Sequence, residues 1–141
     1  MFIISDGDIT WYEPPPVETI SDVAVIRTVD TNLTEGFMNE LTWNFSLSEG
    51  SSVITVKIKL NTDTVVATYI QSLARVTVPQ DFQNRFNFTW IPTKATLLIF
   101  SVSSADNGEF TCEVFSADES GTPTWNRNIQ VNVLGKLGNY H

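Results

Sequence analysis

Residues 106–112 have the sequence Asp-Asn-Gly-Glu-Phe-Thr-Cys, and they decide the fold because they lead from a polar loop into a regular alternation. Residues 103–108 are rich in Ser, Asp, Asn and Gly, which predicts a loop. Beyond the loop, two sets of side chains alternate: Phe110, Cys112 and Val114 on one side, and Thr111, Glu113 and Phe115 on the other. A period of two predicts a β-strand with one buried face and one solvated face.

The same pattern recurs through most of the chain. Short segments that alternate in this way, or that are rich in β-branched residues, are predicted as strands: 41–47, 53–60, 64–70, 86–90, 95–102 and 129–133. Polar turns separate these segments, and no segment shows an apolar stripe at helical spacing. The sequence therefore predicts an all-β antiparallel sandwich or barrel.

The stretch at 106–112 resembles the D-x-G-x-Y-x-C motif of the immunoglobulin superfamily. Three spacings agree with variable-type domains: Arg85 lies 21 residues before Asp106, Gly36 lies 7 residues before Trp43, and Trp43 lies 69 residues before Cys112. The match covers residues 23–134. The resemblance implies a two-sheet antiparallel Greek-key sandwich, variable-type with some intermediate-set character. It also implies that Arg85 and Asp106 form a structural ion pair at the base of the sandwich.

The departures from the family pattern concern the core. Trp43 stands where strand B has a cysteine, and Cys112 is the single cysteine, so the inter-sheet disulfide is missing. Val56 falls near the position of the strand-C tryptophan, and Phe110 replaces the corner tyrosine. We interpret Trp43 as a replacement, since a buried indole contributes about 2–3 kcal/mol and a disulfide about 2–5 kcal/mol. The indole N–H then needs a buried acceptor. The inward parity of Cys112 argues against a disulfide to another chain.

Composition and charge exclude several classes of function. The formal net charge is −8, from 8 Lys and Arg against 16 Asp and Glu, which argues against binding nucleic acid or anionic membranes. The only histidine is the terminal His141, so His-based catalysis and Cys/His metal sites are not expected. We expect no enzyme, no cofactor, no metal and no small-molecule substrate. Membrane attachment is expected only through segments outside this chain, because no apolar run is long enough to span a bilayer.

The chain length predicts one domain, since 141 residues are too few for two good cores. We expect this immunoglobulin-like domain to span residues 23–134. Residues 1–22 are expected to form an N-terminal arm or extra edge strand, with Trp11 and Tyr12 docking it. Residues 135–141 are expected to form a tail or linker.

Three N-glycosylation sequons begin at Asn32, Asn44 and Asn87. Their number is close to what chance placement gives in a chain so rich in Asn, Ser and Thr. Their positions are more informative, because Asn44 and Asn87 fall on the outward parity of their predicted strands, as a glycan requires.

The resemblance implies binding either through loops or through the outer face of the sheet that holds the strands at 53–60 and 110–115, and we expect the outer face to carry the binding residues. Its outward residues are Val53, Thr55, Lys57 and Lys59, then Thr111, Glu113 and Phe115, then Asn128, Gln130 and Asn132. Trp125 lies near the start of the last strand. Aromatic anchors in a polar surround are typical of protein interfaces. The alternative is that Phe115 and Trp125 cover the edge of the core or the N-terminal arm.

The unusual core and the strand-B sequence Trp-Asn-Phe-Ser resemble those of invertebrate cell-surface immunoglobulin-family receptors, including allorecognition receptors that lack the disulfide. This resemblance implies an extracellular domain that mediates adhesion or self/non-self recognition by protein contact, often with an identical domain on another cell. Two alternatives stay open. A cytoplasmic structural module of a muscle-type protein would carry no glycans. A ligand-binding module would cluster aromatic and carboxylate side chains in one set of loops.

Overall fold

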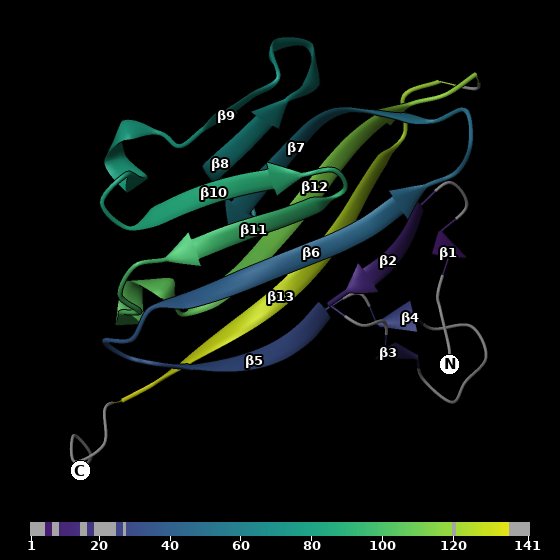
Figure 1. Ribbon diagram of the computed structural model, residues 1–141. Helices are drawn as coiled ribbons and strands as arrows, with labels where there is room; N and C mark the ends of the chain where they lie inside the picture. Colours follow the sequence, from purple (N-terminus) through teal and green to yellow (C-terminus); the bar gives the residue numbers. More distant parts are fainter. Residues whose placement is uncertain are drawn as a thin grey trace.

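The computed structural model describes residues 5–6, 9–14, 17–18, 25–26, 28–119 and 121–135, and its strands form two sheets that pack face to face (Figure 1). The five-stranded sheet has, in spatial order, β1 (Ser5–Asp6), β2 (Ile9–Glu13), β6 (Asn39–Leu47), β11 (Lys94–Ile99) and β10 (Phe86–Ile91). The six-stranded sheet has β5 (Thr28–Thr34), β13 (Thr124–Leu134), β12 (Gly108–Ala117), β7 (Ser52–Leu60), β8 (Thr64–Ile70) and β9 (Arg75–Thr77). This arrangement confirms the predicted all-β sandwich.

Several shorter elements complete the described chain. β3 (Val17–Glu18) and β4 (Val25–Ile26) pair with each other in a separate two-stranded ribbon. Three short 3-10 turns occupy connections between strands: η1 (Gln71–Leu73), η2 (Gln80–Phe82) and η3 (Ser104–Asp106). Residues 1–4 and 136–141, which include most of the predicted tail and His141, lie outside the described residues.

The first strands divide between the two sheets. β2 pairs antiparallel with β6, whereas β5 pairs parallel with β13, so the chain passes from one sheet to the other between them. This parallel pair is the exception to the predicted antiparallel arrangement. Trp11 of β2 is buried with its ring 5.2 Å from the Phe45 ring. The exposed Tyr12 shares a hydrogen bond of 3.1 Å with the Ser46 hydroxyl.

Trp43 lies at the centre of the core, where it spans the two sheets. Its side chain is fully buried, and its Nε1–H donates to the backbone oxygen of Arg127 at 3.1 Å. Arg127 pairs in register with Cys112 on the neighbouring strand. The indole therefore crosses from its own sheet to the residue that pairs with Cys112, and it has the buried acceptor that the sequence required. Cys112 is free and buried, and this burial raises the pKa of its thiol.

The other core positions expected from the sequence are also buried. Val56 and Phe110 have no exposed surface, and the Phe110 ring meets the Phe86 ring edge to face with centroids 6.1 Å apart. Because phenylalanine has no hydroxyl, the Phe110 side chain contributes packing and no hydrogen bond at this corner of the sandwich. Arg127 is a buried residue that the sequence analysis missed; its Nη donates to the backbone oxygen of Pro14 at 3.0 Å.

The base of the sandwich is closed by the ion pair that the resemblance implied. Arg85 Nη lies 2.5 Å from Asp106 Oδ1, and Asp106 Oδ2 accepts a hydrogen bond from the backbone N–H of Ser103. The Asp106 side chain is 2% exposed and the Arg85 side chain 32%, so the carboxylate depends on this partner more than the guanidinium does.

Gly108 is the glycine of the 106–112 motif, and the structure gives a steric reason for a glycine at this position. Its φ is +153°, and a Cβ there would overlap the Asn61 side-chain oxygen. That oxygen accepts the backbone N–H of Glu109, while the Asn61 backbone N–H donates to the Glu109 oxygen. The turn between β7 and β8 is thereby fastened to the first residues of β12.

The strands differ from the predicted segments at several places: β5 was not predicted, and β13 begins five residues before the predicted 129–133. The segment predicted at 95–102 ends as a strand at Ile99, because the backbone N–H of Phe100 donates to Arg85 and that of Val102 to Phe37 instead of continuing a ladder. The short strand β9 was not predicted, since three residues are too few to show a period.

Candidate recognition surface

β7 and β12 supply the centre of the side of the six-stranded sheet that faces away from the other sheet, which we call the outer face (Figure 1). Their antiparallel register sets three outward pairs opposite each other: Thr111 with Lys59, Glu113 with Lys57, and Phe115 with Thr55. The residues between them point inward and are buried: Val56, Ile58, Leu60, Phe110, Cys112 and Val114. The outward side chains of these two strands therefore do not pack in the core between the sheets.

Two charge contacts organise the centre of the outer face. The Lys57 Nζ lies 5.2 Å from the centroid of the Phe115 ring, in a cation–π contact. The Lys59 Nζ lies 3.0 Å from the Glu113 Oε1. Such a partly solvated ion pair contributes only about 0–1 kcal/mol to stability. Lys57 has no carboxylate partner within the described residues, so its charge remains available to a partner.

Ile54 joins the outer face because β7 contains a β-bulge. The register passes from Phe115 opposite Thr55 to Ser116 opposite Val53, so Ile54 is an additional residue in its strand. Ile54 is 40% exposed, whereas Val53 packs against the core. The expectation that Val53 lies on the outer face is therefore wrong, because strict alternation cannot anticipate a residue inserted into the strand.

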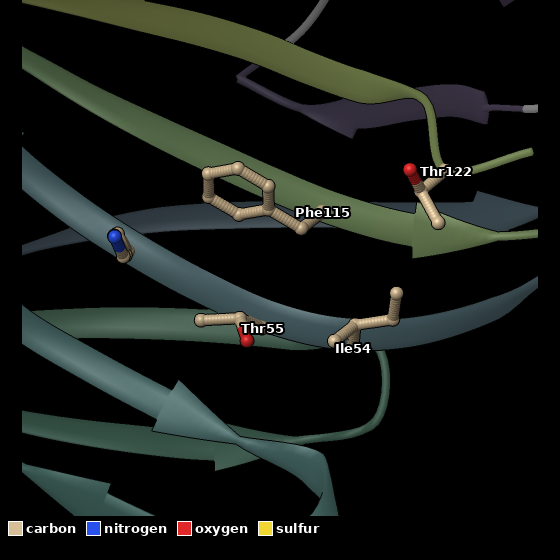
Figure 2. Close-up of a pocket in the computed structure, with 5 residues that line it drawn as sticks. Ile54, Thr55, Phe115 and Thr122 are labelled. Carbon is tan, nitrogen blue, oxygen red and sulfur yellow. The ribbon is translucent and has the colours of Figure 1, made fainter.

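The bulge creates an apolar hollow on the outer face. The hollow has a volume of about 330 Å³ and is lined by Ile54, Thr55, Lys57 and Phe115, with Thr122 from the β12–β13 connection. Figure 2 shows the Phe115 ring on β12, the Ile54 and Thr55 side chains on the adjacent β7, and Thr122 beside the end of β12. An apolar floor beside one ammonium group suits an apolar side chain that is flanked by a carboxylate or carbonyl oxygen.

A second, polar hollow of about 270 Å³ lies further along the same strands. Its lining residues are Lys59, Thr62, Glu109, Thr111, Glu113, Asn126 and Asn128. Because Lys59 and Glu113 are already paired, this hollow presents hydroxyl and amide groups with one further carboxylate, Glu109. The outer face thus changes from apolar at the bulge to polar near the β7–β8 turn.

Trp125 and Gln130 lie apart from the apolar hollow. Trp125 shares the inward parity of Arg127, packs against the core and donates its Nε1–H to the Ser116 hydroxyl at 3.0 Å. It does not join the outer face, and it fits the alternative that it covers the core edge. Gln130 has the outward parity but lies on β13, opposite Glu109 and beside Asp30 of β5.

The three sequons occupy different positions in the sheets. Asn32 lies exposed on β5 and Asn87 lies exposed on β10, whereas Asn44 is half-buried on β6 between the buried Trp43 and Phe45. The outward parity expected for Asn44 and Asn87 agrees with the burial of their neighbours in the strands.

Within the part of the chain that the structure describes, no group of three or more His, Cys, Asp or Glu side chains could hold a metal ion. The same residues include no helix with the length and apolarity needed to cross a membrane.

Comparison with known proteins bears on the fold. No protein-family profile matches the sequence, and neither does any curated protein. Solved structures do match, and one of them is murine CRIg, with a TM-score of 0.64 and 15% sequence identity over 74% of this chain and 92% of the CRIg chain. At this identity the likeness concerns the backbone arrangement alone. The chain is thus an all-β, immunoglobulin-like sandwich without an internal disulfide, similar in fold to murine CRIg.

Proposed function

We propose that this chain is an extracellular recognition domain of a cell-surface receptor, and that it binds a protein partner through the outer face. The proposal includes a role in cell adhesion or self/non-self recognition. The observation that carries it is the apolar hollow at Phe115, where the bulged Ile54 stays exposed on a surface that is otherwise polar. An aromatic anchor beside a pocket, on the central strands of a sheet, is an arrangement in which a few residues can supply most of the binding energy.

The charge pattern of the outer face supports a second copy of the domain as the partner. Lys57 and Lys59 stand on β7, whereas Glu109 and Glu113 stand on β12, so columns of opposite sign run side by side. A two-fold axis parallel to these strands and between them brings β7 of one copy over β12 of the other. Lysines then face glutamates across the interface, and the two hollows meet near the axis.

The net charge tells how such an association should respond to salt. Each copy carries a formal charge of −8, so two copies repel each other at long range. Raising the ionic strength shortens the screening length and reduces this repulsion more than it weakens contacts inside the interface. Association between copies should therefore be weak and should strengthen with salt, whereas binding to a basic partner would weaken.

Sedimentation velocity at rising protein concentration tests the outer face. We expect weak, reversible self-association, and Phe115→Ala should raise its dissociation constant roughly 30-fold, since a central aromatic contributes about 2 kcal/mol. Lys57→Glu should remove the association, because it sets like charges opposite each other. The matched control is Ile91→Ala, which truncates a more exposed apolar residue on β10 of the other sheet. A strict monomer at all concentrations, or equal effects of Phe115→Ala and Ile91→Ala, would contradict the proposed mode.

The extracellular location has a separate test. Secretion of the chain from a eukaryotic cell with a fused leader should add oligosaccharide mass at one or more of Asn32, Asn44 and Asn87, measured on the intact protein. Absence of added mass at all three sites would favour the alternative of a cytoplasmic structural module.

A further inference from the structure

The edges of the two sheets differ in length. Within the described residues, the five-stranded sheet ends in β1 and β10, which have 2 and 6 residues, and the six-stranded sheet ends in β5 and β9, which have 7 and 3. An edge strand presents unpaired N–H and C=O groups that can capture a strand of another chain. Proteins limit this hazard by keeping edges short or by placing obstacles on them. β1 and β9 are short, so β5 and β10 are the edge strands that need another means of preventing pairing with a second chain.

Each of the two long edge strands carries a sequon at an exposed asparagine. Asn32 is the fifth of the seven residues of β5, and Asn87 is the second of the six residues of β10. Neither side chain makes a hydrogen bond within the described part of the chain, so both amides are available for modification. The third sequon differs, because Asn44 lies on β6, which is flanked by β2 on one side and β11 on the other.

We propose that Asn32 and Asn87 carry N-linked oligosaccharides whose role is to prevent edge-to-edge pairing of the sheets. The proposal rests on the extracellular location in the proposed function. In the attachment step, the asparagine Nδ2 forms a bond to the anomeric carbon of an oligosaccharide that is supplied on a lipid pyrophosphate. The bond from that carbon to the phosphate oxygen breaks, the amide gives up one proton, and the lipid pyrophosphate leaves.

The geometry of β5 shows what such a glycan would prevent. Its only strand neighbour within the described residues is β13, and Figure 1 shows it along one margin of the sandwich. Two copies related by a two-fold axis at Thr31 would pair their β5 strands antiparallel, with Asn32 of one copy opposite Asp30 of the other. The two Asn32 side chains would then be diagonal neighbours, about 7–8 Å apart on one face. Two branched oligosaccharides do not fit at that separation.

β10 is the better protected of the two long edges. The Trp90 ring of β10 stacks on the Tyr69 ring of β8, with centroids 4.9 Å apart, so the sheets approach each other along this margin. Asn87 lies three residues before Trp90 along the strand. We therefore expect the loss of a glycan at Asn87 to have a smaller effect than the loss at Asn32.

The first experiment measures occupancy on the chain secreted from a eukaryotic cell with a fused leader. The intact mass of Asn32→Gln and of Asn87→Gln should each fall by one oligosaccharide relative to the parent. An unchanged mass for both variants, with a glycan retained at Asn44, would overturn this inference and leave the extracellular location standing. If no site carries a glycan, both this inference and the proposed extracellular location would be contradicted.

The second experiment measures self-association in a Phe115→Ala background, so that pairing through the outer face does not contribute. Added to this background, Asn32→Gln should give a dimer in sedimentation velocity, with a dissociation constant lower by about tenfold or more. Asn44→Gln is the matched control and should leave the background unchanged. Thr31→Lys, added to the Asn32→Gln protein, should restore the monomer, because an inward-pointing charge on an edge strand opposes pairing.

These outcomes decide the inference without reference to the outer face. If Asn32→Gln stays as monomeric as Asn44→Gln at every concentration, with circular dichroism showing both folded, the edge-guarding role is wrong. Dimers that survive Thr31→Lys would show that the association does not use β5, and they would also overturn the inference.

Discussion

Replacing Trp43 with phenylalanine should lower the free energy of unfolding by about 3 kcal/mol. The indole is fully buried, and its Nε1–H donates to the Arg127 oxygen at 3.1 Å. A phenyl ring lacks this donor, and a lost hydrogen bond to a buried group costs about 1 kcal/mol. It also lacks two buried ring carbons, at about 0.8 kcal/mol each. The gap left between the sheets adds the remainder, because the surrounding side chains relax only partly.

Denaturant unfolding followed by far-UV circular dichroism gives this free energy by linear extrapolation. The matched control is Trp125→Phe, which removes an indole that is half-buried at the core edge and is bonded to the Ser116 hydroxyl at 3.0 Å. Its loss should cost about 1 kcal/mol. If Trp43→Phe cost no more than Trp125→Phe, the indole would not be the element that replaces the inter-sheet disulfide.

Three further predictions concern the thiol, the turn before β12 and the base of the sandwich. Burial raises the pKa of the Cys112 thiol, so above its ordinary value of 9.0 the unfolded chain loses a proton that the folded chain keeps. The free energy of unfolding should therefore fall by up to about 1.4 kcal/mol per pH unit above that value. Urea titrations of the parent and of Cys112→Val at several pH values should show this slope only in the parent. Equal slopes in the two proteins would refute the prediction. Gly108→Ala should cost about 1–3 kcal/mol more than Gly50→Ala in thermal unfolding, since both have positive φ but only Gly108 meets another side chain; equal losses would argue against the overlap. Arg85→Met should cost about 2 kcal/mol by leaving the Asp106 carboxylate buried without its partner, and a double-mutant cycle with Asp106→Asn should show coupling between them; additive losses would contradict it.

The sequence predicted the fold because local period and long-range spacing agree. The alternation around Cys112 defines a half-buried strand, and the spacings from Arg85 to Asp106 and from Trp43 to Cys112 set how far apart the strands lie along the chain. The need for an acceptor for the Trp43 N–H could also be predicted, since a buried donor must be satisfied. The identity of that acceptor could not, because the Arg127 oxygen comes from a strand 84 residues away.

The candidate site was predicted only in part, and the bulge in β7 is the reason. Alternation placed Lys57, Lys59, Glu113 and Phe115 on one face, and the register of β7 with β12 brings them together. Ile54 rather than Val53 lies on the outer face because the pairing of β7 with β12 shifts at Ser116, and no local sequence pattern encodes that shift. The apolar hollow therefore arises from pairing between strands, although every residue that lines it is visible in the sequence.

β12 contributes buried residues to the core on one side and exposed residues to the outer face on the other, so packing in the core determines how rigidly the outer face is held. Cys112 and Val114 are fully buried, and the backbone between them pairs with β7 on one side and β13 on the other. The backbone at Glu113 and Phe115 is consequently fixed, so if the outer face binds a partner as proposed, little backbone conformational entropy would be lost there on binding. In a domain that lacks the inter-sheet disulfide, the outer face can be held rigidly only if other core contacts keep the two sheets together. The Trp43 indole, bonded to the strand next to β12, meets that requirement from the opposite sheet.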